Sequence, residues 1–137
     1  MTIRLGHLIA GEVPLPEGAA SISVHDLTSD SRAVKPGSVF AALPGSSVDG
    51  AKYIPQAIAA GAVAIIAGEG VEAPGVPLIR AANPRQLFAH MAARYFGRQP
   101  DLIVAVTGTS GKTSVATFVR EVATHLRANL AAVHAPA

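Results

Sequence analysis

Apolar positions along the chain form short continuous runs separated by turn-forming residues. The run "AVAIIA" over residues 62–67 has no polar interruption, which is typical of a β-strand covered on both faces. Shorter apolar stretches at 38–43 and 77–81 predict two further strands, and the turn Pro36-Gly37 introduces the first of them. Residues 22–27 predict a short strand or the approach to one.

Two segments between these strands show helical spacing instead. Residues 53–60 predict a short helix that ends at Gly61. Asn83 and Pro84 form a helix start, with Asn as the N-cap and Pro in the first turn, and Gly97 ends that helix. Its core-facing stripe comprises Leu87, Phe88, Met91, Ala92, Tyr95 and Phe96. Strands alternating with helices predict an α/β domain.

A second pattern begins after the polar connector "GRQPD" at 97–101. "LIVAVT" at 102–107 predicts another buried strand, and residues 112–126 predict a helix. The apolar positions expected to face inward on that helix are Val115, Phe118, Val119, Val122 and Leu126. We therefore predict two domains, with the boundary between residues 98 and 99.

The composition limits the classes of protein to which this chain could belong. Half of the residues are hydrophobic, which is enough for a packed core, and the absence of cysteine fits a reducing compartment. No apolar run reaches the roughly 18 residues of a membrane span, and the N-terminus lacks the core of a signal peptide. The net charge of +2 is scattered, without a basic cluster interleaved with aromatics. We expect a soluble cytoplasmic protein that binds no nucleic acid.

The segment from Thr107 to Thr113, "TGTSGKT", carries the clearest chemistry. Its glycines let backbone N–H groups converge at the start of a helix, where the helix dipole favours a phosphate. Lys112 would reach the terminal phosphates, and the Thr113 hydroxyl would ligate Mg²⁺. The alternative is a glycine-rich turn with a surface lysine.

Other catalytic patterns do not fit. The chain has no Gly-x-Gly-x-x-Gly dinucleotide fingerprint. Ser110 is not a nucleophile elbow, because Lys112 stands where that motif requires glycine. The five histidines show no spacing typical of metal ligands.

The phosphate loop "TGTSGKTS" resembles the ATP loop of the Mur ligases, which build the peptide of bacterial peptidoglycan; that family often has Asn where Ser110 stands. The segment "LTSDSRAVKPGSVFAALPGSSVDGAKYIPQAIAAGAVAII" resembles their N-terminal domain, with Asp-Ser-Arg, Pro-Gly, Phe-x-Ala, Asp-Gly and Ala-x-x-x-Gly-Ala in the family's order. "YFGRQP" is more similar to the MurE type than to the MurF type. The resemblance covers residues 22 to 126.

This resemblance implies a Rossmann-like α/β domain with a mixed sheet at 1–98, which binds UDP-MurNAc-L-Ala-D-Glu. Residues 99–137 would be the first strand, P-loop and helix of a P-loop ATPase domain. The implied reaction uses ATP and Mg²⁺: the D-glutamate carboxylate is phosphorylated, and the amine of meso-diaminopimelate or lysine displaces phosphate. A cytoplasmic monomer is expected.

Site residues are carried over by position. Lys112 would be catalytic, Thr113 would ligate Mg²⁺, and the ATP loop comprises Gly108, Thr109, Ser110, Gly111, Lys112, Thr113 and Ser114. The expected UDP-sugar contacts are Ser29, Ser31, Ser46, Ser47 and Val48. The alternatives are a self-bonded turn at Asp30 and Ser31 and a solvated loop at 46–48. Asp30 and Arg32 are expected to form a structural ion pair.

The family has three domains, and the chain is expected to stop just inside the second. An acidic Mg²⁺ ligand, the carbamylated lysine of the family, the adenine pocket and the domain that selects the amino acid would lie beyond residue 137. The tail "RANLAAVHAPA" does not resemble the family strand expected there. We therefore expect the chain alone to be inactive. The alternatives are a MurF-type ligase, a non-catalytic UDP-sugar-binding module, and a P-loop GTPase or kinase, which the short loop disfavours.

Overall fold

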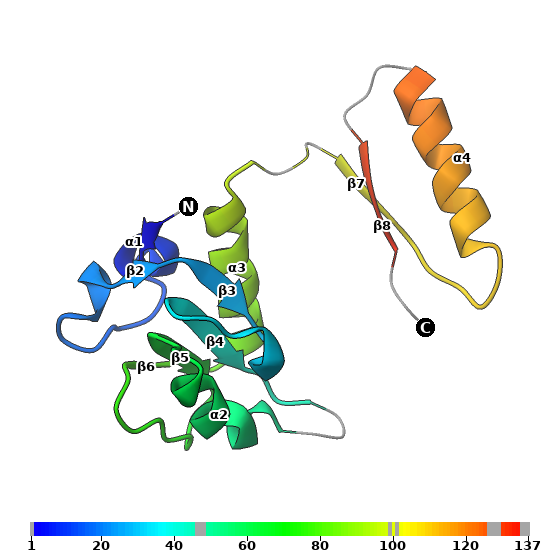
Figure 1. The fold of residues 1–137 in the computed structure, drawn as a ribbon. Helices are drawn as coiled ribbons and strands as arrows, with labels where there is room; N and C mark the ends of the chain where they lie inside the picture. Colours follow the sequence, from blue (N-terminus) through cyan, green and yellow to red (C-terminus); the bar gives the residue numbers. More distant parts are fainter. Residues whose placement is uncertain (1, 46–48, 99, 101, 126–129, 135–137) are drawn as a thin grey trace. The chain divides into compact units, whose positions relative to one another are not determined.

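A computed structural model describes residues 2–45, 49–98, 100, 102–125 and 130–134. The chain divides into two compact units, Met1–Gly97 and Arg98–Ala137 (Figure 1). The boundary predicted from the sequence, between residues 98 and 99, lies one residue further along.

The first unit contains a four-stranded parallel sheet. Its strands are β3 (Asp26–Thr28), β4 (Ser38–Ala42), β5 (Ala64–Ala67) and β6 (Leu78–Arg80), and they lie side by side in chain order. A separate antiparallel pair consists of β1 (Ile3–Arg4) and β2 (Ser23–Val24). The α/β class is confirmed, but the parallel and antiparallel strands stand in separate sheets instead of one mixed sheet.

Three α-helices accompany these strands. They are α1 (Leu5–Ile9), α2 (Ile54–Ala59) and α3 (Pro84–Phe96), and short 3-10 helices are η1 (Ala19–Ser21), η2 (Ser31–Ala33) and η3 (Gly50–Tyr53). The Asn83 side chain accepts a hydrogen bond from the backbone N–H of Gln86 at 3.1 Å, so the predicted N-cap of α3 is confirmed. Helix α1 was not predicted, because five residues are too few to show a period.

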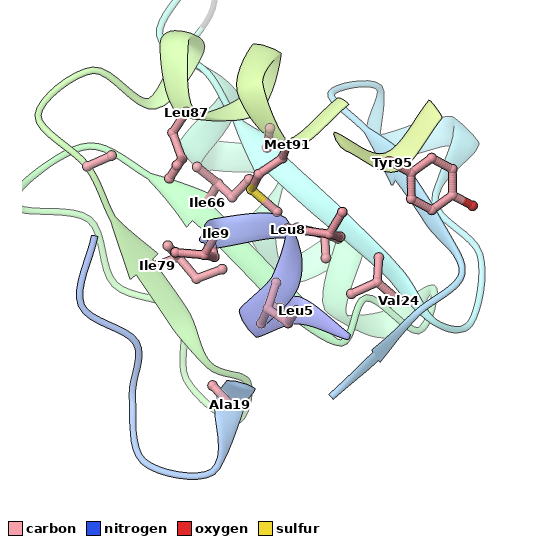
Figure 2. Close-up of a cluster of buried hydrophobic side chains, with 14 residues drawn as sticks. Leu5, Leu8, Ile9, Ala19, Val24, Ile66, Ile79, Leu87, Met91 and Tyr95 are labelled. Atoms are coloured by element: carbon pink, nitrogen blue, oxygen red, sulfur yellow. The ribbon is translucent and has the colours of Figure 1, made fainter. Parts of the chain in front are cut away.

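The core has two layers, one on each face of the parallel sheet. Side chains alternate along β4: Val39 and Ala41 pack with α1 and α3, whereas Phe40 and Ala42 pack with α2. Figure 2 shows the first layer, in which the apolar side chains of α1 lie between α3 and the sheet. Burying Leu5, Leu8 and Ile9 there stabilises α1 despite its length.

The second unit pairs two parallel strands with one helix. Strand β7 (Leu102–Val106) pairs with β8 (Leu130–His134), and α4 spans Lys112–His125. The tail therefore contains a strand, although its sequence does not resemble the one expected there. No helix in the described part of the chain is long and apolar enough to cross a membrane.

The predicted inward face of α4 is wrong for three residues. Val115 and Phe118 are 50% and 67% exposed, and Val122 is 42% exposed. Val119 is half-buried, and Leu126 lies outside the described residues. The reason is the number of layers: one helix on two strands leaves much of the apolar stripe of the helix without a packing partner among the described residues.

Candidate functional site

Two segments meet at the carboxyl edge of the parallel sheet. The first follows β3 and contains Ser29 and η2, and the second follows β4 and contains η3 and α2. Because β3 and β4 are parallel neighbours, the residues after each strand lie at the same edge. They enclose an open hollow of about 540 Å³, lined by Ser29, Asp30, Ser31, Arg32, Tyr53 and Gln56.

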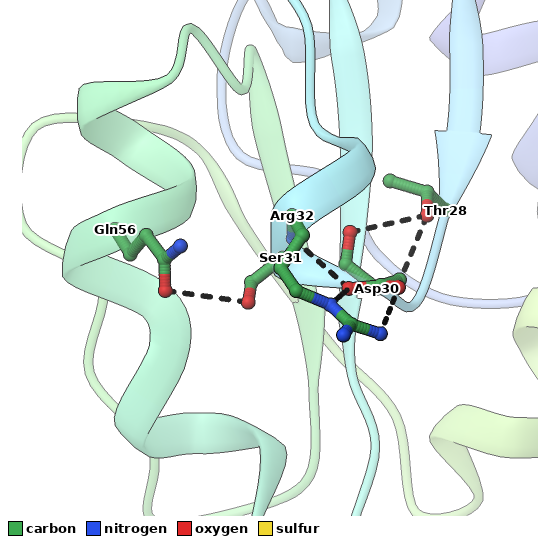
Figure 3. Close-up of polar contacts among 5 residues, drawn as sticks. All are labelled: Thr28, Asp30, Ser31, Arg32 and Gln56. Atoms are coloured by element: carbon green, nitrogen blue, oxygen red, sulfur yellow. Dashed lines mark hydrogen bonds and ion pairs between the residues drawn. The ribbon is translucent and has the colours of Figure 1, made fainter.

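The turn after β3 is held by an ion pair (Figure 3). Arg32 donates from Nε to Asp30 Oδ1 at 2.9 Å and from Nη2 to Oδ2 at 2.7 Å. Asp30 Oδ1 also accepts from the Arg32 backbone N–H at 3.0 Å, and Thr28 Oγ1 accepts from the Asp30 backbone N–H. The Arg32 guanidinium and these hydrogen bonds lower the pKa of Asp30 to about 2. The expected structural pair is confirmed.

Ser31 makes a different contact. Its hydroxyl donates to Gln56 Oε1 at 3.3 Å, and the residue is only 9% exposed. The alternative of a self-bonded turn therefore describes Asp30, but Ser31 instead bonds a residue 25 positions away in the sequence. Ser29 is exposed and lines the same hollow.

Gln56 and Tyr53 were not predicted as site residues. Both belong to the segment predicted as a short helix, and nothing in their local pattern separates them from an ordinary solvent-facing helix start. Their place follows from the parallel pairing of β3 and β4, which a sequence does not display. One signal could have identified them as site residues. It is a polar side chain in the first turn of a helix that directly follows a buried parallel strand.

The second expected contact stretch, Ser46, Ser47 and Val48, lies outside the described residues. The chain on either side of it is closed by an antiparallel bridge between Pro44 and Asp49. The Gly50 backbone N–H donates to the Leu43 carbonyl at 3.0 Å, and a Cβ at Gly50 would lie 2.6 Å from that oxygen. Arg85 Nη2 also donates to the Pro44 carbonyl at 2.9 Å. Pro44 and Asp49 are therefore held together beside the carboxyl end of β4.

The phosphate loop lies in the second unit, between β7 and α4. Gly108 and Gly111 have φ values of 150° and 74°, which side-chain-bearing residues rarely adopt. Lys112 is the first residue of α4 and is half-buried, while Thr113 and Ser114 are exposed in the first turn. Within the described ranges, no three His, Asp or Glu side chains gather as a metal site.

Residues 23–96 match the family model described as "Mur ligase family, catalytic domain". The chain belongs to the Mur ligase family. This match covers more than half of the chain and spans the hollow at the carboxyl edge.

Similar Mur ligases are found by sequence and by fold. The chain is 48% identical over 120 residues to the UDP-N-acetylmuramoyl-L-alanyl-D-glutamate–2,6-diaminopimelate ligase of Bradyrhizobium diazoefficiens, a match that covers 88% of this chain and 25% of that ligase. A crystal structure of MurF from Acinetobacter baumannii has a TM-score of 0.68 at 23% identity, covering 92% of this chain and 28% of that one.

A second similar solved structure contains a bound nucleotide. MurF ligase from Thermotoga maritima, in complex with ADP, has a TM-score of 0.56 at 27% identity and covers 74% of this chain and 24% of that one. This chain therefore spans about a quarter of the length of the Mur ligases that it matches.

The predicted site residues fall into three groups. Ser29 and Ser31 lie together at the hollow, the stretch 46–48 is outside the described residues, and the phosphate loop belongs to the other unit. The ligands of all three groups stay predictions.

Proposed function

We propose that this chain is the N-terminal part of a MurE-type ligase in peptidoglycan precursor synthesis. The parent enzyme would join 2,6-diaminopimelate to UDP-N-acetylmuramoyl-L-alanyl-D-glutamate in the cytoplasm. The observation that carries this proposal is the 48% identity to a ligase named for that reaction, over 88% of the chain. Several further relatives at 46% to 52% identity are named for the same reaction, which favours the MurE type.

The first unit would bind the UDP-sugar dipeptide. Its hollow lies outside the carboxyl ends of parallel strands, which is where open α/β sheets bind ligands. Ser29 and Ser31 supply hydroxyl groups there, and the Asp30–Arg32 pair fixes the turn that carries them. Because three hydrogen bonds from Arg32 already engage the Asp30 carboxylate, we assign Asp30 a structural role in this turn.

The second unit would bind ATP at residues 108–114. Its residues fit a nucleotide: two glycines take positive φ, a helix of 14 residues starts at Lys112, and the loop is exposed. Lys112 would contact the terminal phosphates, and the Thr113 hydroxyl would contribute to Mg²⁺ binding. When bound, ATP supplies the phosphoryl group that activates a carboxylate for attack by an amine.

Binding of UDP-N-acetylmuramoyl-L-alanyl-D-glutamate to the chain tests the first-unit assignment. We expect titration of the ¹⁵N-labelled chain to shift the amide resonances of Ser29 and Ser31, because both residues line the hollow. Ser29→Ala should weaken the titration, whereas Ser21→Ala should not, since Ser21 bonds the Gly18 carbonyl away from that hollow. A titration without shifts near Ser29 and Ser31 would contradict the proposal.

A further inference from the structure

The hollow contains a pair of polar side chains whose hydrogen bonds are only partly used. The Ser31 hydroxyl donates to Gln56 Oε1, so its oxygen keeps two lone pairs as acceptors. Gln56 is exposed, and no hydrogen bond from its Nε2 is found among the described residues. In this arrangement Ser31 offers an acceptor and Gln56 offers N–H donors, one beside the other.

Such a pair is complementary to a ligand group with a donor and an acceptor on one edge. In UDP-N-acetylmuramoyl-L-alanyl-D-glutamate, the acetamido and peptide groups are trans amides, whose N–H and C=O point in opposite directions. The imide edge of uracil differs, because its ring holds N3–H next to a carbonyl on the same side. The base therefore offers a rigid, planar edge that fits Ser31 and Gln56 together.

The other residues of the hollow suit a base as well. Tyr53 is half-buried and belongs to the same lining as Gln56, and the Lys52 ammonium lies 5.3 Å from its ring centroid. Aromatic side chains commonly stack on planar bases. Arg32 uses its Nε and Nη2 donors on the two carboxylate oxygens of Asp30, so its charge is partly balanced within the lining of the hollow.

We propose that Gln56, acting with Ser31, reads the imide edge of uracil in the UDP-sugar substrate. This inference rests on the proposed function of the first unit and adds a recognition residue to it. The ligand N3–H would donate to Ser31 Oγ, and the Gln56 amide would donate to the adjacent carbonyl of the base.

Two ligands and three variants of the full chain test this inference. UDP carries the N3–H, whereas UDP methylated at N3 cannot donate there, and both can be titrated by NMR against the wild-type chain. Gln56→Glu keeps an acceptor for the Ser31 hydroxyl but has no N–H donor, and Gln56→Ala removes both. Gln86→Glu is the matched control, since Gln86 is exposed on α3 and does not line the hollow.

We expect the wild-type chain to bind UDP about tenfold more tightly than N3-methyl UDP, the effect of one lost hydrogen bond. Gln56→Glu and Gln56→Ala should each weaken UDP binding about tenfold, because the contact to the base carbonyl is lost. The preference for UDP over N3-methyl UDP should remain in both variants, because it depends on Ser31. Gln86→Glu should leave both affinities unchanged. Because Gln56 is exposed, the circular dichroism of its variants should match that of the wild type.

Different outcomes of these titrations would contradict the inference and the proposed function. If the wild-type chain binds UDP and its N3-methyl form equally, or if both Gln56 variants bind UDP like the wild type, the inference is wrong while the UDP-sugar site stands. If neither UDP nor the UDP-sugar dipeptide binds the wild-type chain, the proposed function of the first unit is wrong, and the inference fails with it.

Discussion

The Asp30 carboxylate fixes the turn that lines one side of the hollow. Its pKa is lowered from 3.8 to about 2 by the Arg32 side chain and backbone N–H. We expect the ¹³C carboxyl resonance of Asp30 to titrate at about pH 2, and Arg32→Gln should move that midpoint up toward 3.8. Arg32→Lys should give an intermediate value, because it keeps the charge without the two-pronged contact.

The sign of the pH effect on folding follows from this lowered pKa. A depressed folded-state pKa means that the Asp30 contribution is complete above the ordinary value of 3.8 and is lost as the pH falls through about 2. The effect should be small and salt-sensitive, because both side chains are well exposed. An Asp30 midpoint near 3.8 in the wild-type chain would show that the pair does not persist in solution.

At the scale of the elements, the stability of α3 depends on the N-cap at its first turn. The Asn83 side chain caps it through the Gln86 N–H, and the helix brings Leu87 and Met91 into the core. We expect Asn83→Ala to lower the free energy of unfolding by about 1 kcal/mol, the usual effect of losing an N-cap. Urea unfolding followed by circular dichroism measures this change.

The matched variant for the cap is Asn83→Asp, which keeps an oxygen at the same position. It should preserve the unfolding free energy, since aspartate caps as well as asparagine. Equal losses in Asn83→Ala and Asn83→Asp would show that the cap is not what stabilises the start of α3.

At the scale of the whole molecule, the phosphate loop is exposed within the described part of the second unit. Thr113 and Ser114 are exposed, and the apolar residues Val115, Phe118 and Val122 of the same helix have little cover in the described part of the second unit. Phosphoryl transfer is accelerated in sites that exclude water and fix several charges around the phosphates. We therefore expect no measurable ATP hydrolysis or ligation by the 137-residue chain.

Phosphate release from ATP and Mg²⁺, with the UDP-sugar dipeptide and diaminopimelate present, measures this expectation. Lys112→Ala is the informative variant, and Lys52→Ala is its control because Lys52 belongs to the first unit. Turnover by the wild-type chain that persists in Lys52→Ala and disappears in Lys112→Ala would contradict the expectation.

Most of the first unit was predictable because its signals are local. The apolar run at 62–67 contains β5, and Asn83-Pro84 begins α3, since each reflects burial or capping within a few residues. Helix α1 escaped prediction because its five residues are stabilised by distant packing against α3 and the sheet. The exposure of Phe118 was also missed, because periodicity gives a face of a helix but not what covers it.

The amino-acid sequence was sufficient for the family motifs, the order of most strands and helices, the turn at Asp30 and the glycine-containing loop between β7 and α4. These features depend on neighbouring residues, whose backbone preferences and side-chain spacing are readable along the chain. The contact of Ser31 with Gln56, the hollow around them and the uncovered face of α4 required the folded chain. They arise from strand pairing and layer packing, which bring together residues that no local pattern connects.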